Sequence, residues 1–442
     1  MEIILISIFS LGYLFITLEH SLKIDKLIPA LGMMALLWAL ISLTHLPVFE
    51  VNTVLKQLEP THIDEALLHH LGKTAEILIF LLGAMTIVEI IDYFNGFFTI
   101  KSFIKTTSKK GLLYIFAFLA FILSAIIDNL TATIVLLTIL QKVVKDRNTR
   151  LWFAGLIVIC ANAGGAWSPI GDVTTTMLWI GKKVSTVKLI SYLLIPSIVC
   201  AVVPVIAATF LPAFKGNISN QGKDDNDAPD KRGAMMLYLG LSAIIFVPVF
   251  KVVTNLPPYV GMMLSLAVVA TFAEILSKSK INITSIDEIH DQDSSHSPVH
   301  KSLSKIELPS ILFFLGILMA VAALESLGML FEFAELLNDT IPNTDIVVIL
   351  LGIGSAIIDN VPLVAASMGM FSELIDDPLW HFIAFSAGTG GSMLIIGSAA
   401  GVVAMGMERI DFFWYLKKIA WLAAIGFLSG SFTFILIRNF FL

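Results

Sequence analysis

The sequence predicts an all-α polytopic membrane protein made of two inverted-topology repeats, with about ten membrane spans, two re-entrant hairpins and broken transmembrane helices. Three observations support this fold class. Of the 442 residues, 57% are hydrophobic and 14% are charged, whereas globular domains are about one quarter charged. Apolar stretches close to the roughly 20 residues that cross a bilayer recur along the chain. The second half also repeats motifs of the first half.

The internal repeat sets the domain boundaries. The hexapeptide SAIIDN occurs at residues 124–129 and again at 355–360, and NAGG at 162–165 matches GTGG at 388–391. We therefore expect a leading span, a first repeat, a linker with a connecting span, and a second repeat, at residues 1–26, 27–211, 212–255 and 256–442. Because one connecting span separates the copies, they are inverted in the membrane. The N-terminal segment lacks the basic region and cleavage site of a signal peptide, so we expect it to be a retained span.

Loop charges orient the first repeat, because short loops rich in Lys and Arg stay in the cytoplasm. Residues 98–111 carry four lysines and no acid, and residues 141–150 carry two lysines and two arginines. If both flanks are cytoplasmic, the apolar segment between them has to enter the membrane and return. This predicts a re-entrant hairpin over residues 112–140, broken at Asp128 and Asn129.

The second repeat shows the opposite charge pattern. Residues 332–344 and 372–380 contain acids but no Lys or Arg, so both loops are expected outside. The segment between them predicts a second hairpin over residues 345–371, broken at Asp359 and Asn360.

Counting spans in this way also places residues 47–73 outside. That loop contains His62, His69 and His70. These histidines could sense pH near neutrality, or they could be exposed side chains without a role. Lys182 and Lys183 fall on the predicted outer side, against the charge rule. The polar segments 212–233 and 278–307 are expected to be flexible cytoplasmic loops.

Two further segments combine glycine with polar residues in a way that an ordinary lipid-facing helix does not. NAGGAWSPIGDVTTT predicts a broken helix over residues 151–180, and SAGTGGSMLIIGSAAG predicts another over residues 381–407. In the second copy Ser398 takes the place of Asp172. The glycines have an alternative interpretation, since small residues also permit close packing between helices.

Three aspartates lie inside predicted membrane segments, namely Asp128, Asp172 and Asp359. An ionised carboxylate in hydrocarbon costs several kcal/mol unless it faces a cavity or a partner, so these residues are candidates for a transport site. The alternative is that each one caps the first amides of a half-helix. Glu89, Asp92 and Glu325, in or at the ends of spans, are candidates for shuttling protons. Glu76 is expected at a solvated helix end.

The surroundings of these aspartates favour a cation as cargo. No Lys or Arg occurs within residues 112–140, 151–181 or 345–407. Carboxylates, amides and hydroxyls suit a hard ion such as sodium, although an anion could still bind at half-helix N-termini. A proton and a metal ion can compete for one carboxylate, which is the minimal mechanism of an antiporter. The small net charge gives no reason to expect nucleic acid as a partner, and we expect no cofactor.

Four motifs carry a family resemblance. They are SAIIDNLTAT, NAGGAWSPIGDVTTTMLWIGK, GSAIIDNVPLVAA and GTGGSMLIIGSAAGVVAMG. Together they resemble the NhaD-type sodium/proton antiporters of bacteria, within the ion transporter superfamily, and the similarity covers nearly the whole chain. The resemblance implies that sodium or lithium leaves the cytoplasm while protons enter, across the bacterial cytoplasmic membrane. It leaves the oligomeric state open, with a homodimer as one alternative.

The resemblance also implies a set of ion-site residues. They are Ser124, Asp128, Asn129, Asn162, Asp172, Thr174 and Thr175 from the first copy, with Ser355, Asp359, Asn360, Ser392 and Ser398 from the second copy. Sodium is expected at Asp128 and Asp172.

Two other functions stay open as alternatives. A carboxylate or arsenite transporter of the same superfamily would share the fold, but dicarboxylate carriers of the superfamily have neutral Ser-Asn-Thr tips, whereas each tip here carries an aspartate. An intramembrane aspartyl protease would also place two aspartates in the membrane. Asp128 and Asp359 lack the Gly-x-Gly-Asp-like context of such enzymes, and a protease has no need of an inverted repeat.

Overall fold

The structure is a computed structural model of the chain. It describes residues 2–17, 24–52, 57–101, 104, 106–218, 231–278, 297–306, 308–330, 332–333, 340–341, 343–357 and 360–441. Asp359, expected at the break of the second hairpin, lies outside the described residues.

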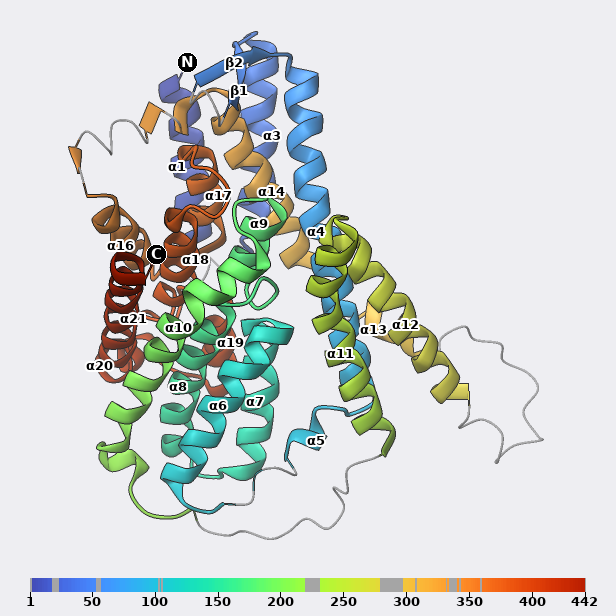
Figure 1. The fold of residues 1–442 in the computed structure, drawn as a ribbon, viewed down its shortest axis with the longest axis vertical. Coiled ribbons are helices and arrows are strands. Elements are labelled where there is room, and N and C mark those ends of the chain that lie inside the picture. The colour runs from blue at the N-terminus through green and yellow to red at the C-terminus, as the bar shows by residue number, and fades with distance from the viewer. Residues whose placement is uncertain are drawn as a thin grey trace.

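Helices dominate the described structure, and most of them run roughly along its long axis (Figure 1). The first half contains α1 (Glu2–Thr17), α3 (Leu27–Leu43), α4 (Ile63–Tyr93), α5 (Phe98–Lys101), α6 (Lys109–Ile127), α7 (Asn129–Val143), α8 (Arg147–Gly165), α9 (Val173–Ile180), α10 (Thr186–Thr209) and the 3-10 turn η1 (Pro212–Phe214). The second half contains α11 (Lys231–Thr254), α12 (Pro258–Lys278), α13 (Pro298–Leu303), α14 (Leu308–Ser326), α16 (Thr344–Gly354), α17 (Asn360–Met370), α18 (Pro378–Gly390), α19 (Ala399–Glu408), α20 (Phe412–Lys418) and α21 (Ala420–Phe441).

Seven of the described helices are long and apolar enough to cross a membrane: α4, α6, α10, α11, α12, α14 and α21. Helices α1 and α3 are apolar and only slightly shorter. The prediction of an all-α polytopic membrane protein is therefore confirmed.

The segment between α3 and α4 differs from the outer loop expected over residues 47–73. Val48–Asn52 and Gln57–Thr61 form two antiparallel strands, β1 and β2, and α4 starts directly afterwards. Two acids in the first turn of α4 suit the positive end of the helix dipole. His69 and His70 therefore lie on α4, and the expectation that they belong to a loop was wrong. Likewise α13 forms within the segment 278–307, which had been expected to be a loop throughout.

The first expected hairpin consists of α6 and α7, which pack along each other and are separated by the single residue Asp128. Helix α6 has 19 residues, so it is about 28 Å long and exceeds a half-membrane limb. In the second copy α16 ends at Gly354 and α17 begins at Asn360. There α16 packs on α18, while α17 packs on α14, α9 and α18.

The segments expected as broken helices are each divided into two helices. The first is α8, which ends at Gly165, followed by α9 from Val173. The second is α18, which ends at Gly390, followed by α19 from Ala399. The longer member of each pair lies in the core, because every residue of α8 from Phe153 onwards and every residue of α18 from Trp380 onwards is buried.

The two halves exchange packing partners reciprocally. Helix α3 packs on α14 while α12 packs on α4, and α7 packs on α19 while α17 packs on α9. Helix α10 packs along α21. Figure 1 shows α6 and α7 in the lower half of the molecule, and α9 and α17 together in the upper half. The helix breaks of both copies therefore lie at a similar height along the long axis of the molecule.

Two glycines at equivalent places allow this close packing. A Cβ at Gly164 of α8 would lie 2.7 Å from the Cα of Phe121 on α6, and a Cβ at Gly390 of α18 would lie 2.7 Å from the carbonyl carbon of Gly352 on α16. Real Cβ atoms do not approach backbone so closely. Close helix packing, the alternative interpretation of these glycines, is therefore what the structure shows at Gly164 and at Gly390.

Candidate functional site

Asp172 lies where the two copies meet. It is 2% exposed and is the N-cap of α9, and its Oδ1 accepts a hydrogen bond from the backbone N–H of Thr174 at 3.0 Å. Its Oδ2 accepts hydrogen bonds from Nδ2 of Asn129 at 3.1 Å and from Nδ2 of Asn360 at 3.4 Å. Asn129 begins α7 and Asn360 begins α17. One buried carboxylate thus receives donors from the half-helices of both copies.

The hydrogen-bond network continues from Asn129 to the second broken helix. Asn129 also donates to Oδ1 of Asn162 at 3.0 Å, and Asn162 donates to the hydroxyl of Ser398 at 3.0 Å. Ser398 is the N-cap of α19 and accepts from the N–H of Gly401. Ser398 therefore occupies the place in α19 that Asp172 occupies in α9, but without its charge.

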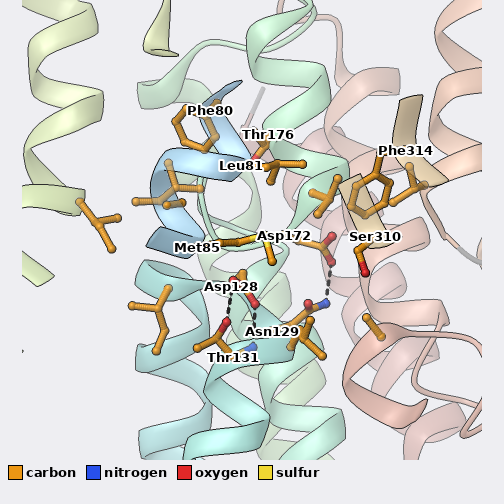
Figure 2. Close-up of a pocket in the computed structure, with 18 of the residues that line it drawn as sticks. Phe80, Leu81, Met85, Asp128, Asn129, Thr131, Asp172, Thr176, Ser310 and Phe314 are labelled. Atoms are coloured by element: carbon orange, nitrogen blue, oxygen red, sulfur yellow. Dashed lines mark hydrogen bonds between the residues drawn. The ribbon is translucent and has the colours of Figure 1, made fainter. Parts of the chain in front are cut away.

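Asp128 has an unusual backbone conformation. Its φ of 79° and ψ of 160° fall in a region that almost only glycine adopts, at a cost of about 1–3 kcal/mol. Its carboxylate accepts hydrogen bonds from the N–H of Thr131 at 2.8 Å and from the Thr131 hydroxyl at 3.0 Å (Figure 2). Asp128 and Asp172 thus both cap helices, as the alternative interpretation proposed. Capping does not need a charge, as Ser398 shows, so capping alone gives no reason for an aspartate at the buried position 172 or at the partly buried position 128.

Both aspartates border one cavity of about 100 Å³. This volume holds a dehydrated or partly hydrated small ion and a few waters. Figure 2 shows the carboxylates of Asp128 and Asp172 in the middle of this region, with Phe80, Met85 and Phe314 around them. Further polar lining groups are Asn129, Asn360, Thr131, Thr176, Ser310 and Lys26. The cavity is thus a mostly apolar pocket with two carboxylates.

Sequence reasoning missed four of these polar residues, and one of them, Thr131, supplies the hydrogen bonds to Asp128. Thr176 is the last of the three threonines after Asp172, and its hydroxyl donates to the carbonyl of Pro169. Ser310 and Lys26 come from the start of α14 and from the residue before α3, and only the tertiary fold brings them to the cavity. The absence of Lys and Arg from the predicted membrane segments therefore does not keep a cation away from the cavity. The Lys26 ammonium lies 4.4 Å from the centre of the Phe313 ring.

Three serines expected in the ion site donate their hydroxyl hydrogens to backbone carbonyls, which leaves the oxygen lone pairs of each hydroxyl available to an ion. The hydroxyl of Ser124 donates to Ala161 at 2.6 Å, and that of Ser355 donates to Ala387 at 2.8 Å. These two bonds are equivalent, because each joins a hairpin limb to the core helix of the same copy. The third, Ser392, donates to the carbonyl of Thr389 at 2.7 Å. Their hydroxyls hold the helices that carry the site.

Thr174 and Thr175 differ in what their hydroxyls contact. The Thr175 hydroxyl donates to the backbone carbonyl of Asp172 at 2.9 Å. The Thr174 hydroxyl is buried and has no hydrogen-bond partner among the residues that the structure describes. A Cβ at Gly388 would lie 3.4 Å from Oδ2 of Asp172 and 3.7 Å from Oγ1 of Thr174, so the two oxygens face the same small space. Thr174 is therefore a candidate ligand beside Asp172.

The candidates for proton shuttling are dispersed. Asp92 is at the surface, with its side chain 57% exposed and 3.7 Å from the Lys305 ammonium. Glu89 is half-buried on α4. Glu325 lines a second cavity of about 130 Å³ at the end of the molecule that carries β1 and β2. This second cavity is also lined by Glu50, His69, His70, Lys73 and Lys183.

Helices that break within the membrane domain and bring polar groups of two related halves to one buried carboxylate are typical of secondary transporters. This class is what the fold and the site define. The chain belongs to the citrate transporter family, whose family model matches residues 13–380. Several of its relatives are named sodium/proton antiporters.

Sodium/proton antiporter 1 of Arabidopsis thaliana is 42% identical over 98% of this chain and 72% of its own length. Sodium/proton antiporter 2 of the same plant is 39% identical over 98% of this chain and 99% of its own length. The Na⁺/H⁺ antiporter NhaD of Vibrio cholerae is 31% identical over 95% of this chain and 87% of its own length. The resemblance to NhaD-type antiporters is therefore confirmed, and the protein is a transporter rather than an enzyme.

A solved structure shares the fold. The YdaH transporter of Alcanivorax borkumensis aligns with a TM-score of 0.55 over 94% of this chain and 97% of its own, at 13% sequence identity. At this identity the likeness concerns the fold alone.

Proposed function

We propose that this protein exchanges cytoplasmic sodium for external protons. The observation that carries the proposal is Asp172, a buried carboxylate that receives amide donors from both copies and shares one cavity with Asp128. Relatives that align over nearly the whole chain are named sodium/proton antiporters, which supports the same cargo.

The exchange of sodium for protons follows from oxygen ligands that bind either ion. Sodium is a hard cation that binds carboxylate, amide and hydroxyl oxygens. Asp128 and Asp172 supply charge, and the hydroxyl of Thr174 supplies a neutral oxygen. A proton on either carboxylate removes the charge that holds sodium. Sodium and protons therefore occupy the site alternately, and a change of access between the two occupancies gives exchange.

Four finer points belong to the proposal. The membrane is the bacterial cytoplasmic membrane, as the loop charges and the NhaD relatives suggest. Lithium is a second cargo, because it offers the same charge to the same ligands. A homodimer is the assembly. Glu89 and Glu325 carry protons between solvent and the site, each from its own helix, whereas Asp92, with its side chain 57% exposed, is already in contact with solvent.

The family description leaves citrate as the competing cargo. A tricarboxylate would need several cationic or N–H donors, and Lys26 is the cation that lines the cavity within the described residues. Two carboxylates on the same cavity repel such an anion. The site therefore favours sodium.

Purified protein in proteoliposomes tests the cargo. An imposed sodium gradient should change the internal pH, as measured with a trapped pH-sensitive dye, and lithium should replace sodium. An equal gradient of potassium is the control and should have no effect. Accumulation of labelled citrate without any sodium-dependent pH change would contradict the proposal.

A further inference from the structure

The end of each broken helix is held by the other half of the chain. At the C-terminus of α19, Nε of Arg150 donates to both carboxylate oxygens of Glu408, at 3.1 and 3.0 Å. Arg147 donates to the backbone carbonyl of Arg409 at 3.0 Å. Both arginines belong to the first turn of α8. The Glu408 side chain is only 1% exposed, so this is a buried ion pair that joins the two copies.

The C-terminus of α9 is held by a different set of groups. The N–H of Asp376 donates to the carbonyl of Lys183 at 2.8 Å, and Oδ1 of Asp376 accepts from the N–H of Ser185 at 2.6 Å. Asp376 has a φ of 64° and lies in the turn before α18. It thereby holds the chain between α9 and α10.

His381 takes the position of Arg150 in this second arrangement. Asp146 and Asp377 are the N-caps of α8 and α18, and Arg150 and His381 are each the fourth residue after the cap. The His381 side chain is fully buried, and neither ring nitrogen has a hydrogen-bond partner within the described part of the chain. Its Nε2 lies 3.5 Å from Oδ1 of Asp376, at the limit of a hydrogen bond.

The other groups that face His381 are few. From α10, the Tyr192 ring packs edge-on at 4.5 Å between ring centres, and Lys188 contributes a repulsive positive charge. On the neighbouring elements Lys183 lies over the Trp380 ring, and Arg438 of α21 is paired with Asp345 of α16. Asp376 is therefore the acid that can pair with a charged His381.

We propose that His381 and Asp376 form a proton-operated latch between the two halves, the counterpart of the permanently charged Arg150–Glu408 pair. When His381 is neutral, Asp376 holds the chain after α9 by hydrogen bonds alone. When His381 takes up a proton, its N–H donates to the Asp376 carboxylate and gives a charge-assisted bond. Asp376, with its side chain 13% exposed, is the route by which solvent protons reach the ring.

The chemistry of the side chain makes this latch respond to pH while its counterpart does not. Arginine stays charged at every accessible pH, whereas histidine gains and loses its charge, and burial moves that change of His381 to acid pH. His381 also lies in the first turn of α18, where the helix dipole opposes a positive charge. The protonated form therefore depends on Asp376. Because alternating access moves structural units against each other, a tightened latch slows transport in acid.

Hydrogen exchange of the full-length protein in detergent tests the latch itself. The peptide that carries residues 183–186 is followed between about pH 8 and 4, because a fully buried histidine takes up its proton well below neutrality, with rates corrected for intrinsic exchange. We expect protection of this peptide to rise by about tenfold on acidification. The peptide around residues 409–411, next to the arginine pair, is the internal control and should not change.

Variants separate the latch from a general effect of pH. His381→Gln should give weak protection at every pH, and His381→Arg should give strong protection at every pH. Asp376→Asn provides an independent variant that should also abolish the pH dependence. A rise in protection that persists in both His381→Gln and Asp376→Asn would overturn the proposal.

The effect on transport rests on the proposed function and is measured separately. Sodium-dependent proton flux of His381→Gln should fall less in acid than that of the unaltered protein, with an equal rate at alkaline pH. If the protein exchanged no sodium, hydrogen exchange would still decide whether the latch exists. If protection did not depend on pH, the latch would be wrong while the antiport proposal stood.

Discussion

Replacing Gly164 by alanine tests whether the core helix α8 has to touch the first hairpin. The added Cβ would lie 2.7 Å from the Cα and 2.8 Å from the carbonyl carbon of Phe121, about 0.7 Å inside ordinary contact distance. Backbone atoms cannot rotate away, so α6 has to move. Overpacking of this kind costs about 1–3 kcal/mol. The hydrogen bond from Ser124 to Ala161, one turn away, contributes about 1 kcal/mol more if it breaks.

We therefore expect Gly164→Ala to lower the free energy of unfolding by about 2–4 kcal/mol. Thermal unfolding in detergent measures this, with Gly32→Ala as the matched control. Gly32 lies in α3, where a Cβ would meet nothing within 4 Å, so alanine should stabilise that helix by up to about 1 kcal/mol. Sodium-dependent proton flux should fall as well, because α6 carries Asp128 at its end. A Gly164→Ala protein as stable and as active as the unaltered protein would refute the reasoning.

Four further substitutions, two of them combined in one double-mutant cycle, test other parts of the account. Ser398→Ala removes the cap of α19 and the acceptor of Asn162, so the thermal midpoint should fall, with a loss of about 1–2 kcal/mol; an unchanged midpoint would contradict that role. Arg150→Gln leaves the buried Glu408 carboxylate unpaired and should cost about 3–5 kcal/mol. Adding Glu408→Gln should recover part of this loss in a double-mutant cycle, whereas purely additive losses would show no coupling. Asp92→Asn should change flux and stability little, since Asp92 is 57% exposed, and a large loss of flux would restore it as a proton relay.

The helix breaks could be predicted from the sequence because their causes are local. An Asp-Asn pair in an apolar run and glycines next to Pro169 are incompatible with a continuous lipid-facing helix, and the structure divides the chain at both places. The reciprocal packing of the halves also follows from the repeated motifs, since equivalent segments meet equivalent partners.

The rest of the site could not be predicted, because it depends on tertiary contacts. Lys26 lies in a loop, and the rule that basic loops are cytoplasmic uses such a lysine only to assign orientation. Its position beside the cavity depends on the tertiary fold. The paired hydrogen bonds of Ser124 and Ser355 to core helices depend on side-chain direction. The strands β1 and β2 were missed because a hydrophobicity count of the loop does not register cross-strand pairing. His69 was wrongly assigned to a loop because α4 also includes the polar residues that precede its apolar part.

The central claim is that Asp128 and Asp172 carry the ion rather than merely cap helices, and one set of substitutions tests it most directly. Asp146 is the matched control, because it accepts from the N–H and the hydroxyl of Thr149 just as Asp128 accepts from those of Thr131, but outside the site. The Thr149 hydrogen bonds hold the pKa of Asp146 below its usual range, so it is also ionised.

Asparagine caps helices as well as aspartate does, so Asp→Asn keeps the cap and removes the charge. Removing a group that only hydrogen-bonds to a metal ligand lowers metal affinity or activity about 10–100-fold. Removing a ligand itself should therefore lower it at least about 100-fold. Sodium-driven proton flux in proteoliposomes should therefore fall by at least about 100-fold in Asp128→Asn and in Asp172→Asn, and should be retained in Asp146→Asn. Full flux in both site variants would contradict the account.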